Sequence, residues 1–170
     1  AQELFMDLLK ERAETGRIYI MNIDHCNTHS SFKDKVYMSN LCQEITLPTT
    51  PIQHIDDKEG EIALCILSAI NLGLLTDIDE LEELCDLSVR ALDEIIDYQE
   101  YPVEAAKVST LARRSLGIGF IGLAHYLAKN QVNYESKAAA KLVDKVSEAF
   151  QFYLLKASNN LAKEKSKCLW

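Results

Sequence analysis

The stretch "IALCILSAINLGLL", residues 62–75, is an apolar run interrupted only by Ser68, Asn71 and Gly73. Its length and its isoleucines and leucines predict a buried β-strand, although periodicity alone leaves a helix open. Cys65 lies inside the run, and a thiol in such a place is usually a small buried hydrophobe. If Cys65 met another cysteine, it could instead be one half of a redox pair.

The segments before this run predict a strand and a helix joined by polar loops. The connector "TLPTTPIQHIDDKEG" at 46–60 holds two prolines and ends in glycine. Further back, "RIYIMNI" at 17–23 has the β-branched and aromatic residues of a buried strand, followed by a polar loop at 24–35. Apolar residues at helical spacing predict a first helix over residues 4–12 that stops at Gly16.

After the run the pattern turns helical from about residue 76. We expect helices over 76–101, ended by Pro102, and over 104–114, 119–129 and 135–165. The predicted buried faces are Ile78, Leu81, Cys85, Ser88, Leu92 and Ile95 in the first, and Leu142, Val146, Ala149, Phe150, Tyr153, Leu154, Ala157 and Leu161 in the last. Strands in the N-terminal half followed mainly by helices indicate an α/β class, as part of a layered structure.

Composition narrows the classes of function. The chain has 170 residues and a formal net charge of −8, which argues against general affinity for nucleic acid or anionic membranes. No apolar segment reaches the roughly 20 residues of a membrane span, so we expect a soluble, cytoplasmic protein. Five cysteines, an odd number, fit reduced thiols better than a disulfide framework. The chain begins and ends in helical pattern, from which we expect a fragment.

The stretch "SNLCQEITLP", residues 39–48, places reactive polar groups at every second position. In an extended strand Asn40, Cys42 and Glu44 would share one face, roughly 7 Å apart. That spacing would bracket a sugar ring. A solvent-facing edge strand explains the same alternation without any ligand.

Other motifs have plainer explanations. "DHCNTH" gathers His25, Cys26 and His29, but its spacing matches no zinc signature and favours a hydrogen-bonded loop, so we expect no metal site. "GIGFIG" at 117–122 matches the dinucleotide fingerprint by letter but lacks the preceding strand, which favours glycines that ease helix packing. Arg113 and Arg114 could touch a phosphate or carboxylate, and an exposed basic pair is the simpler interpretation.

Several motifs in fixed order carry a resemblance to a known family. They are "TGRIYIMNIDHCNTHS", "SNLCQEITLPTTP", "GEIALCILSAINLG", "RRSLGIGFIGLAHYLAK" and "YLLKASNNLAKEKSKC". Through them, over essentially all 170 residues, the chain resembles the large (alpha, catalytic) subunit of class I ribonucleoside-diphosphate reductases of the bacterial and phage type. The resemblance implies part of a ten-stranded α/β barrel. Residues 1–170 would be the central part of the catalytic barrel domain, with no complete domain and a finger loop at about 37–50.

The resemblance also implies residue roles in the radical reduction of ribonucleoside diphosphates to 2′-deoxyribonucleoside diphosphates. Cys42 would become a thiyl radical, Glu44 would act as base, and Asn40 would hold the ribose hydroxyl. Cys65 would be one of two redox thiols, its partner lying outside this chain. The implied substrate-binding residues are Ser39, Asn40, Leu41, Cys42 and Glu44.

The implied partners lie outside this chain. A metal-containing small subunit would supply the radical, and thioredoxin or glutaredoxin would be the reductant, so no cofactor is expected in this chain. The remainder of the large subunit, which dimerises, would carry the allosteric ATP and nucleotide sites. The fragment alone would be inactive. Two alternatives stay open: a helical protein-interaction module with buried structural cysteines, supported by the stripe at 142–161, and a nicotinamide-dependent oxidoreductase, which needs a strand just before Gly117.

Overall fold

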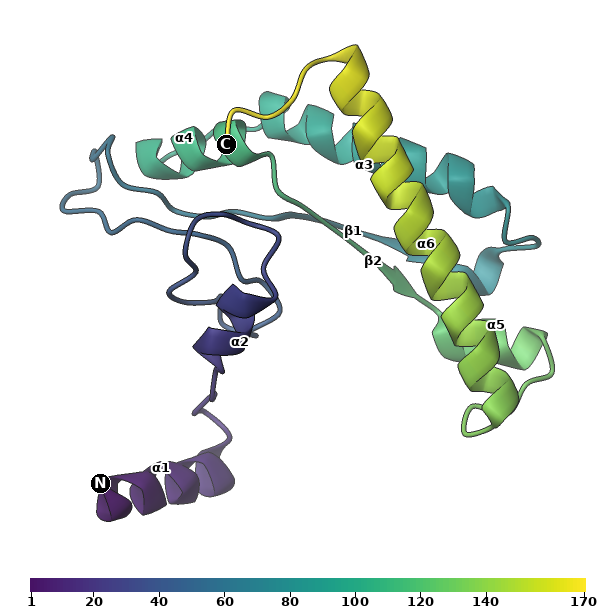
Figure 1. The fold of residues 1–170 in the computed structure, drawn as a ribbon, viewed down its shortest axis with the longest axis horizontal. Helices are drawn as coiled ribbons and strands as arrows, with labels where there is room; N and C mark the ends of the chain where they lie inside the picture. Colours follow the sequence, from purple (N-terminus) through teal and green to yellow (C-terminus); the bar gives the residue numbers. More distant parts are fainter.

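The computed structural model describes all 170 residues, with six α-helices and two strands in a mixed α/β arrangement. In chain order the elements are α1 (Gln2–Thr15), α2 (Ile23–Thr28), β1 (Ile66–Asn71), the 3-10 turn η1 (Leu72–Leu74), α3 (Glu80–Tyr98), α4 (Glu104–Arg113), β2 (Leu116–Ile121), α5 (Leu123–Lys129) and α6 (Lys137–Glu164) (Figure 1). None of the helices combines the length and apolar composition that a bilayer crossing requires.

The centre of the fold is a parallel pair of strands. β1 and β2 pair in register from Ile66 opposite Leu116 to Asn71 opposite Ile121, with α3 and α4 forming the connection between them. Parallel strands require such a long crossover. The apolar run at 62–75 is therefore a strand over its middle, as its composition predicts, and turns into η1 at Leu72.

Helices α3 and α6 lie across one face of this pair and bury the core there (Figure 1). The rings of Phe120 on β2 and Phe150 on α6 meet edge to face at 5.5 Å between centroids. The central core cluster comprises Ile70, Leu72, Leu75, Leu81, Cys85, Tyr126, Val146 and Phe150. The stripe expected along the last helix is confirmed, since all its members are buried or packed against the two core clusters.

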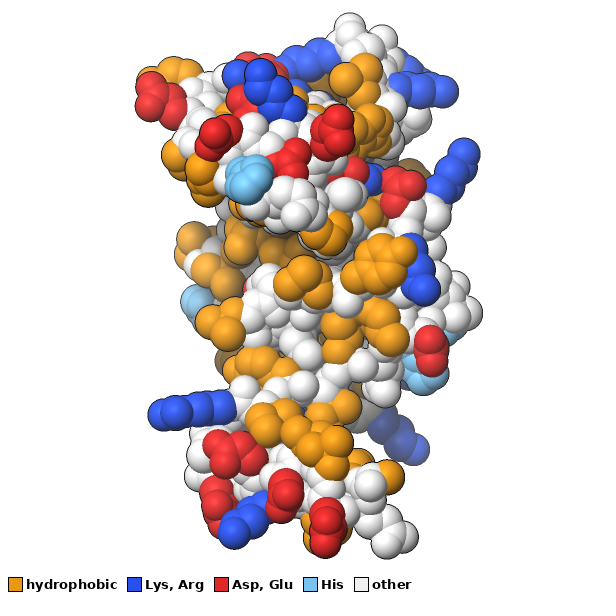
Figure 2. Space-filling model, turned by 90° about the vertical axis from the view of Figure 1, so that its left-hand side faces the viewer, with side chains coloured by type: hydrophobic (Ala, Val, Ile, Leu, Met, Phe, Trp, Pro, Cys, Tyr) orange, Lys and Arg blue, Asp and Glu red, His pale blue; other side chains and the backbone are white.

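The opposite face of the strand pair carries no helix. Leu67 on β1 is 61% exposed, and Ile121 on β2 is 55% exposed. Figure 2 shows hydrophobic side chains exposed across the middle of one side of the molecule. Parallel sheets are normally covered on both faces and paired at their edges. The two strands thus have the character of a piece of a larger sheet.

Several of the predicted elements differ in the structure. Residues 24–28, predicted as the start of a polar loop, belong to α2. Residues 17–22 form no strand, and Tyr19 and Ile20 are more than half exposed, because no neighbouring strand is present to pair with them. The helix predicted over 119–129 is instead β2 followed by α5. Glycine is unfavourable inside a helix, and Gly122 takes a left-handed φ of 75° at the turn between β2 and α5.

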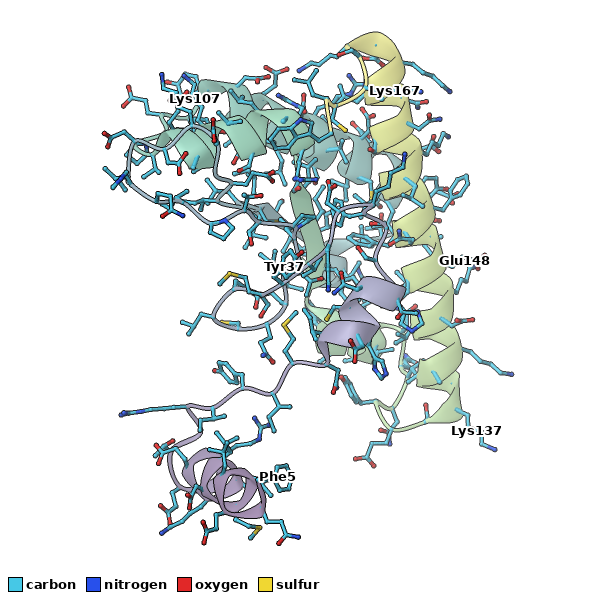
Figure 3. The ribbon with its side chains drawn as sticks, turned by 60° about the vertical axis from the view of Figure 1, so that its left-hand side comes forward. Phe5, Tyr37, Lys107, Lys137, Glu148 and Lys167 are labelled. Carbon is cyan, nitrogen blue, oxygen red and sulfur yellow. The ribbon has the colours of Figure 1, made fainter.

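Helix α3 buries a slightly different face from the predicted one. Val89 and Ile96 are buried, whereas Ile95 is 43% exposed. The predicted face followed a spacing of about 3.5 residues, while a straight helix repeats every 3.6, so the face drifts by one position over several turns. Helix α1 ends at Gly16 as predicted, but none of its residues is buried, and Phe5 projects from it apart from the rest of the chain (Figure 3).

Candidate functional site

Residues 40–44 form a tight turn, which we call the Asn40–Glu44 turn, and the extended strand predicted there is wrong. The backbone carbonyl of Asn40 accepts a hydrogen bond from the Gln43 amide at 3.1 Å, and Gln43 has a φ of 62°. The Asn40 side chain accepts from the Ile45 amide, also at 3.1 Å. Asparagine side chains compete in this way with strand pairing, which the alternation of residue types could not reveal.

The turn brings two of the predicted site residues into contact and exposes the third. Asn40 Nδ2 donates to Glu44 Oε1 at 2.5 Å, so the amide and carboxylate form a bonded pair. Cys42 lies between them in the chain, is exposed, and carries a free thiol. The turn thus presents a thiol flanked by a hydrogen-bonded acid and amide. A thiol can exchange a hydrogen atom, and a carboxylate held in place by an amide can accept a proton.

The two remaining predicted substrate-binding residues lie on either side of Asn40 in the chain. Ser39 Oγ donates to the Asn40 carbonyl at 3.1 Å, so Ser39 supports the turn from within. Leu41 is 81% exposed and projects into solvent. A cavity of about 860 Å³ adjoins the turn and is lined by Ser39, Asn40, Ile45 and the residues around Thr50 and Ile62.

Two contacts fix the segments that lead into and out of the turn. On the incoming side, Asn27 of α2 donates to the Val36 carbonyl and accepts from the Val36 amide, both at 2.8 Å, and Val36 is fully buried. On the outgoing side, Thr50 and Glu61 form an isolated antiparallel bridge with backbone hydrogen bonds of 3.2 and 2.9 Å. The bridge ties the end of the turn segment to the segment that leads to Cys65.

Cys65 precedes β1 and faces the side of the strand pair that no helix covers. By strand alternation it shares this side with Leu67, whose partner in register is Gly117. A Cβ atom on Gly117 would lie 2.8 Å from Cys65 Sγ, so glycine leaves the space that the sulfur occupies. The pKa of the Cys65 thiol is raised, first by burial and second by the negative charge of Glu44. The electrostatic effect of Glu44 links the turn to Cys65 across 21 positions of sequence.

Cys85, Cys168, His25 and His29 form no comparable site. Cys85 is buried on α3 as predicted, and burial raises its pKa to about 11, which keeps it protonated. Cys168 is exposed near the end of the chain. His25 on α2 and His29, the residue after α2, pack edge to face at 6.3 Å between ring centroids. The structure contains no group of three or more His, Cys, Asp or Glu residues arranged to hold a metal ion.

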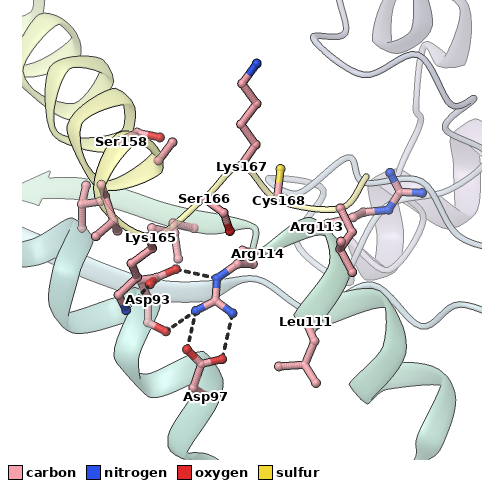
Figure 4. A pocket seen from close by; sticks show the side chains of 15 residues that line it. Asp93, Asp97, Leu111, Arg113, Arg114, Ser158, Lys165, Ser166, Lys167 and Cys168 are labelled. Carbon is pink, nitrogen blue, oxygen red and sulfur yellow. Dashed lines mark hydrogen bonds and ion pairs between the residues drawn. The ribbon is translucent and has the colours of Figure 1, made fainter.

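The two arginines at the end of α4 are not an exposed pair, and that interpretation is wrong. Arg114 pairs with Asp93 and Asp97 of α3, beside a cavity of about 410 Å³. Arg113 leaves the helix in a different direction, away from those two carboxylates (Figure 4). Its side chain is only 7% exposed and pairs with Asp34 and Glu61. The pair of basic letters was the only sign of these contacts in the sequence.

Neither alternative function gains support from the geometry. The stripe on α6 packs inside the chain against α3, so it is not a free interaction surface. The glycines Gly117 and Gly119 lie within β2, whereas the dinucleotide fingerprint places its glycines after a strand.

Comparison with known proteins gives a consistent result. A sequence model of the family described as "Ribonucleotide reductase, barrel domain" matches residues 1–169. The chain is 62% identical to the ribonucleoside-diphosphate reductase subunit alpha of Haemophilus influenzae, over 99% of this chain and 23% of that protein. It is 57% identical to ribonucleoside-diphosphate reductase 1 subunit alpha of Escherichia coli, over 100% of this chain and 23% of that protein. The subunit alpha of phage T4 is 43% identical, over 97% of this chain and 22% of that protein.

A solved structure shares the fold. The class Id ribonucleotide reductase alpha subunit of Actinobacillus ureae superposes with a TM-score of 0.77 at 28% identity, over 99% of this chain and 33% of that chain. The chain therefore spans less than a quarter of the length of these curated relatives and a third of the solved one.

Proposed function

Because the chain belongs to the ribonucleotide reductase barrel-domain family, whose sequence model matches residues 1–169, we propose that it forms the part of an alpha subunit that begins the reduction of ribonucleoside diphosphates. The observation that carries this proposal is the Asn40–Glu44 turn, where an acid and an amide 2.5 Å apart flank the exposed thiol of Cys42.

In the proposed reaction Cys42 is the first group to react with the substrate. As a thiyl radical it takes the hydrogen atom from the ribose 3′ carbon, and the S–H bond of Cys42 forms as the C–H bond breaks. Glu44 accepts the proton of the 3′ hydroxyl as general base. Asn40, bonded to Glu44 through Nδ2, orients the carboxylate and holds the ribose hydroxyl.

Cys65 acts in the reductive half of the same reaction. The 2′ hydroxyl leaves as water, and Cys65 with a second thiol outside this chain supplies two electrons and becomes a disulfide. The hydrogen atom then returns from Cys42 to the 3′ carbon, which restores the thiyl radical. The raised pKa of Cys65 suits this role, because a protonated thiol brings its proton along with the electrons.

The remaining requirements are proposed to come from other polypeptides. A metal-containing small subunit generates the radical, and thioredoxin or glutaredoxin reduces the disulfide. The rest of the alpha subunit, which dimerises, covers the bare face of β1 and β2 and supplies the second redox thiol. Ser39 and Leu41 line the approach of the substrate to the turn.

The substitution Cys42→Ser in the complete subunit tests the proposal. We expect loss of deoxyribonucleotide formation with substrate binding retained, because a serine O–H bond is too strong to form the radical. Activity is measured as deoxyribonucleotide formed per subunit, and binding by calorimetry. Cys168→Ser is the matched control, since its exposed thiol lies outside the Asn40–Glu44 turn, and we expect it to keep full activity. Substantial turnover by Cys42→Ser would overturn the assignment.

A further inference from the structure

We propose that Arg113 is a positioning residue that holds together three short segments, which we call stems. They are the incoming stem of the Asn40–Glu44 turn (residues 34–39), its outgoing stem (residues 45–50) and the stem of Cys65 (residues 61–64). Arg113 thereby sets the distance between the turn and the Cys65 thiol. This inference rests on the proposed function, because the distance matters only if both groups act on one substrate. Arg113 touches neither the turn nor Cys65, and acts through Asp34 and Glu61.

The guanidinium of Arg113 contacts two segments directly and a third through Glu61. Its Nη1 lies 2.9 Å from Asp34 Oδ2, and its Nη2 lies 3.0 Å from Glu61 Oε2. The other oxygen of Glu61 accepts a hydrogen bond from Thr50 Oγ1 at 3.3 Å. Asp34, Thr50, Glu61 and Arg113 all line one hollow of about 320 Å³. One side chain therefore joins the incoming stem, the outgoing stem and the stem of Cys65.

The stems are short, so a shift at Arg113 reaches the reacting groups. Asp34 is six residues before Asn40, and Thr50 is six residues after Glu44. Glu61 is four residues before Cys65. Each stem spans at most about 20 Å when extended, which leaves little slack to absorb a displacement.

Arg113 is itself held by a rigid element. It is the last residue of α4, and its guanidinium carbon lies 5.0 Å from the centre of the Trp170 ring. The same helix also holds the stem of Cys65 through two hydrogen bonds to Ile62. The Ile62 amide donates to the Ala105 carbonyl at 3.3 Å, and Ser109 Oγ donates to the Ile62 carbonyl at 2.5 Å. Helix α4 is thus the scaffold from which the stems are placed.

The neighbouring Arg114 supplies a matched comparison. It makes as many ion pairs as Arg113, but both its partners lie on α3, and none lies on a stem (Figure 4). If arginine at the end of α4 only stabilised the fold, loss of either side chain would have the same kind of effect. A positioning role predicts that only Arg113 affects the relation between the turn and Cys65.

The test uses the influence of the Glu44 charge on Cys65 as a measure of their separation. In the complete subunit, Arg113→Met and Arg114→Met are each made with Glu44 intact and with Glu44→Gln. The rate of Cys65 alkylation by iodoacetamide is followed against pH, with the labelled peptide identified by mass spectrometry. This readout needs no turnover, and kcat and KM are measured separately for the two arginine variants.

We expect Glu44→Gln to lower the pKa of Cys65 in the parent and in Arg114→Met, because a negative charge near the thiol is removed. In Arg113→Met the same change should have no effect, since the stems have moved apart. Arg113→Met should also lower kcat by about tenfold or more at unchanged KM, whereas Arg114→Met should keep kcat per folded subunit.

An equal response to Glu44→Gln in Arg113→Met and the parent would overturn the proposal, as would an unchanged kcat. If Arg113→Met does not fold, Glu61→Gln replaces it. That variant removes the charge on the Cys65 stem, keeps the side-chain shape, and should show the same loss of coupling. Absence of turnover in the parent subunit would count against the proposed function, while the alkylation result would still decide the role of Arg113.

Discussion

At the scale of single residues, Gly117 is important because the absence of a Cβ atom leaves space for the Cys65 sulfur. A Cβ at this position would lie 2.8 Å from Cys65 Sγ and 2.5 Å from a methyl group of Leu67. Leu67 is 61% exposed and can turn aside, but Cys65 has less freedom, because its side chain is partly buried against the strand pair. Extra atoms in such a place cost about 1–3 kcal/mol.

We therefore expect Gly117→Ala to displace the Cys65 sulfur and slow steady-state turnover with a dithiol reductant by about tenfold, with little change in KM. Gly119→Ala is the matched control, because a Cβ there meets nothing within 4 Å. Steady-state kinetics of both variants in the complete subunit would decide the matter. Equal rates for the two variants would show that Cys65 tolerates the displacement or has no redox role.

At the scale of elements, the joint between α3 and the end of α4 depends on Arg114. This residue has a left-handed φ of 50°, a conformation that glycine usually adopts at a helix end. Its side chain pairs with Asp93 and Asp97, and Lys165 also reaches Asp93. The ion pairs offset the backbone strain, so an arginine occupies a position where the helix-end pattern favours glycine.

Acid should loosen this joint. Burial raises the pKa of Asp93, but hydrogen bonds from Arg114 and Lys165 outweigh burial and lower it overall, and Arg114 lowers the pKa of Asp97. A folded pKa below the unfolded value of about 3.9 means that the stabilisation is complete above that pH and is lost as the pH falls through the folded value. Hydrogen exchange of α3, corrected for intrinsic rates, should stay slow from about pH 7 to 4 and accelerate below.

The variant Arg114→Met should weaken this acid-dependent step, because only Lys165 then pairs with Asp93. It should also lower the local stability by on the order of 3 kcal/mol, since it leaves buried Asp93 with fewer partners. Lys156→Met is the control, because its ion pair with Glu82 is exposed and should contribute little. An acid step of unchanged size in Arg114→Met would place its origin elsewhere in the chain.

At the scale of the whole molecule, the surface is too large for a self-contained domain. The accessible surface is 12126 Å², whereas a compact monomer of 19.2 kDa has about 8,400 Å². Helix α1 buries nothing, and the strand pair is bare on one face and unpaired at both edges. Exposed apolar surface of this extent marks a face that binds another surface or promotes aggregation.

We predict that the 170-residue chain expressed alone keeps helical circular dichroism, binds the apolar dye ANS, self-associates and reduces no ribonucleotide. The complete subunit at equal molar concentration should bind far less dye. Dye titration and light scattering on both proteins provide the measurement. A monomeric chain with sharp two-state unfolding and no dye binding would contradict the idea that its bare faces need a cover.

The sequence by itself determined the class of the fold, the strand in the apolar run at 62–75, the long helix with its buried stripe, and the family. These features rest on local periodicity and on motif order, which neighbouring residues encode directly. It also singled out Asn40, Cys42, Glu44 and Cys65 by resemblance. Alternation alone misread the first three as strand residues, because it cannot register a side chain that bonds the backbone of its own turn.

Only the tertiary structure decided what joins these residues. The contact of Arg113 with Asp34 and Glu61, and the space that Gly117 leaves for Cys65, each connect positions some 50 or more residues apart. No local pattern encodes such contacts, because they arise when α4 and β2 pack beside segments from the first half of the chain. The sequence motif therefore identifies the residues of the site, while residues outside the motif set its geometry.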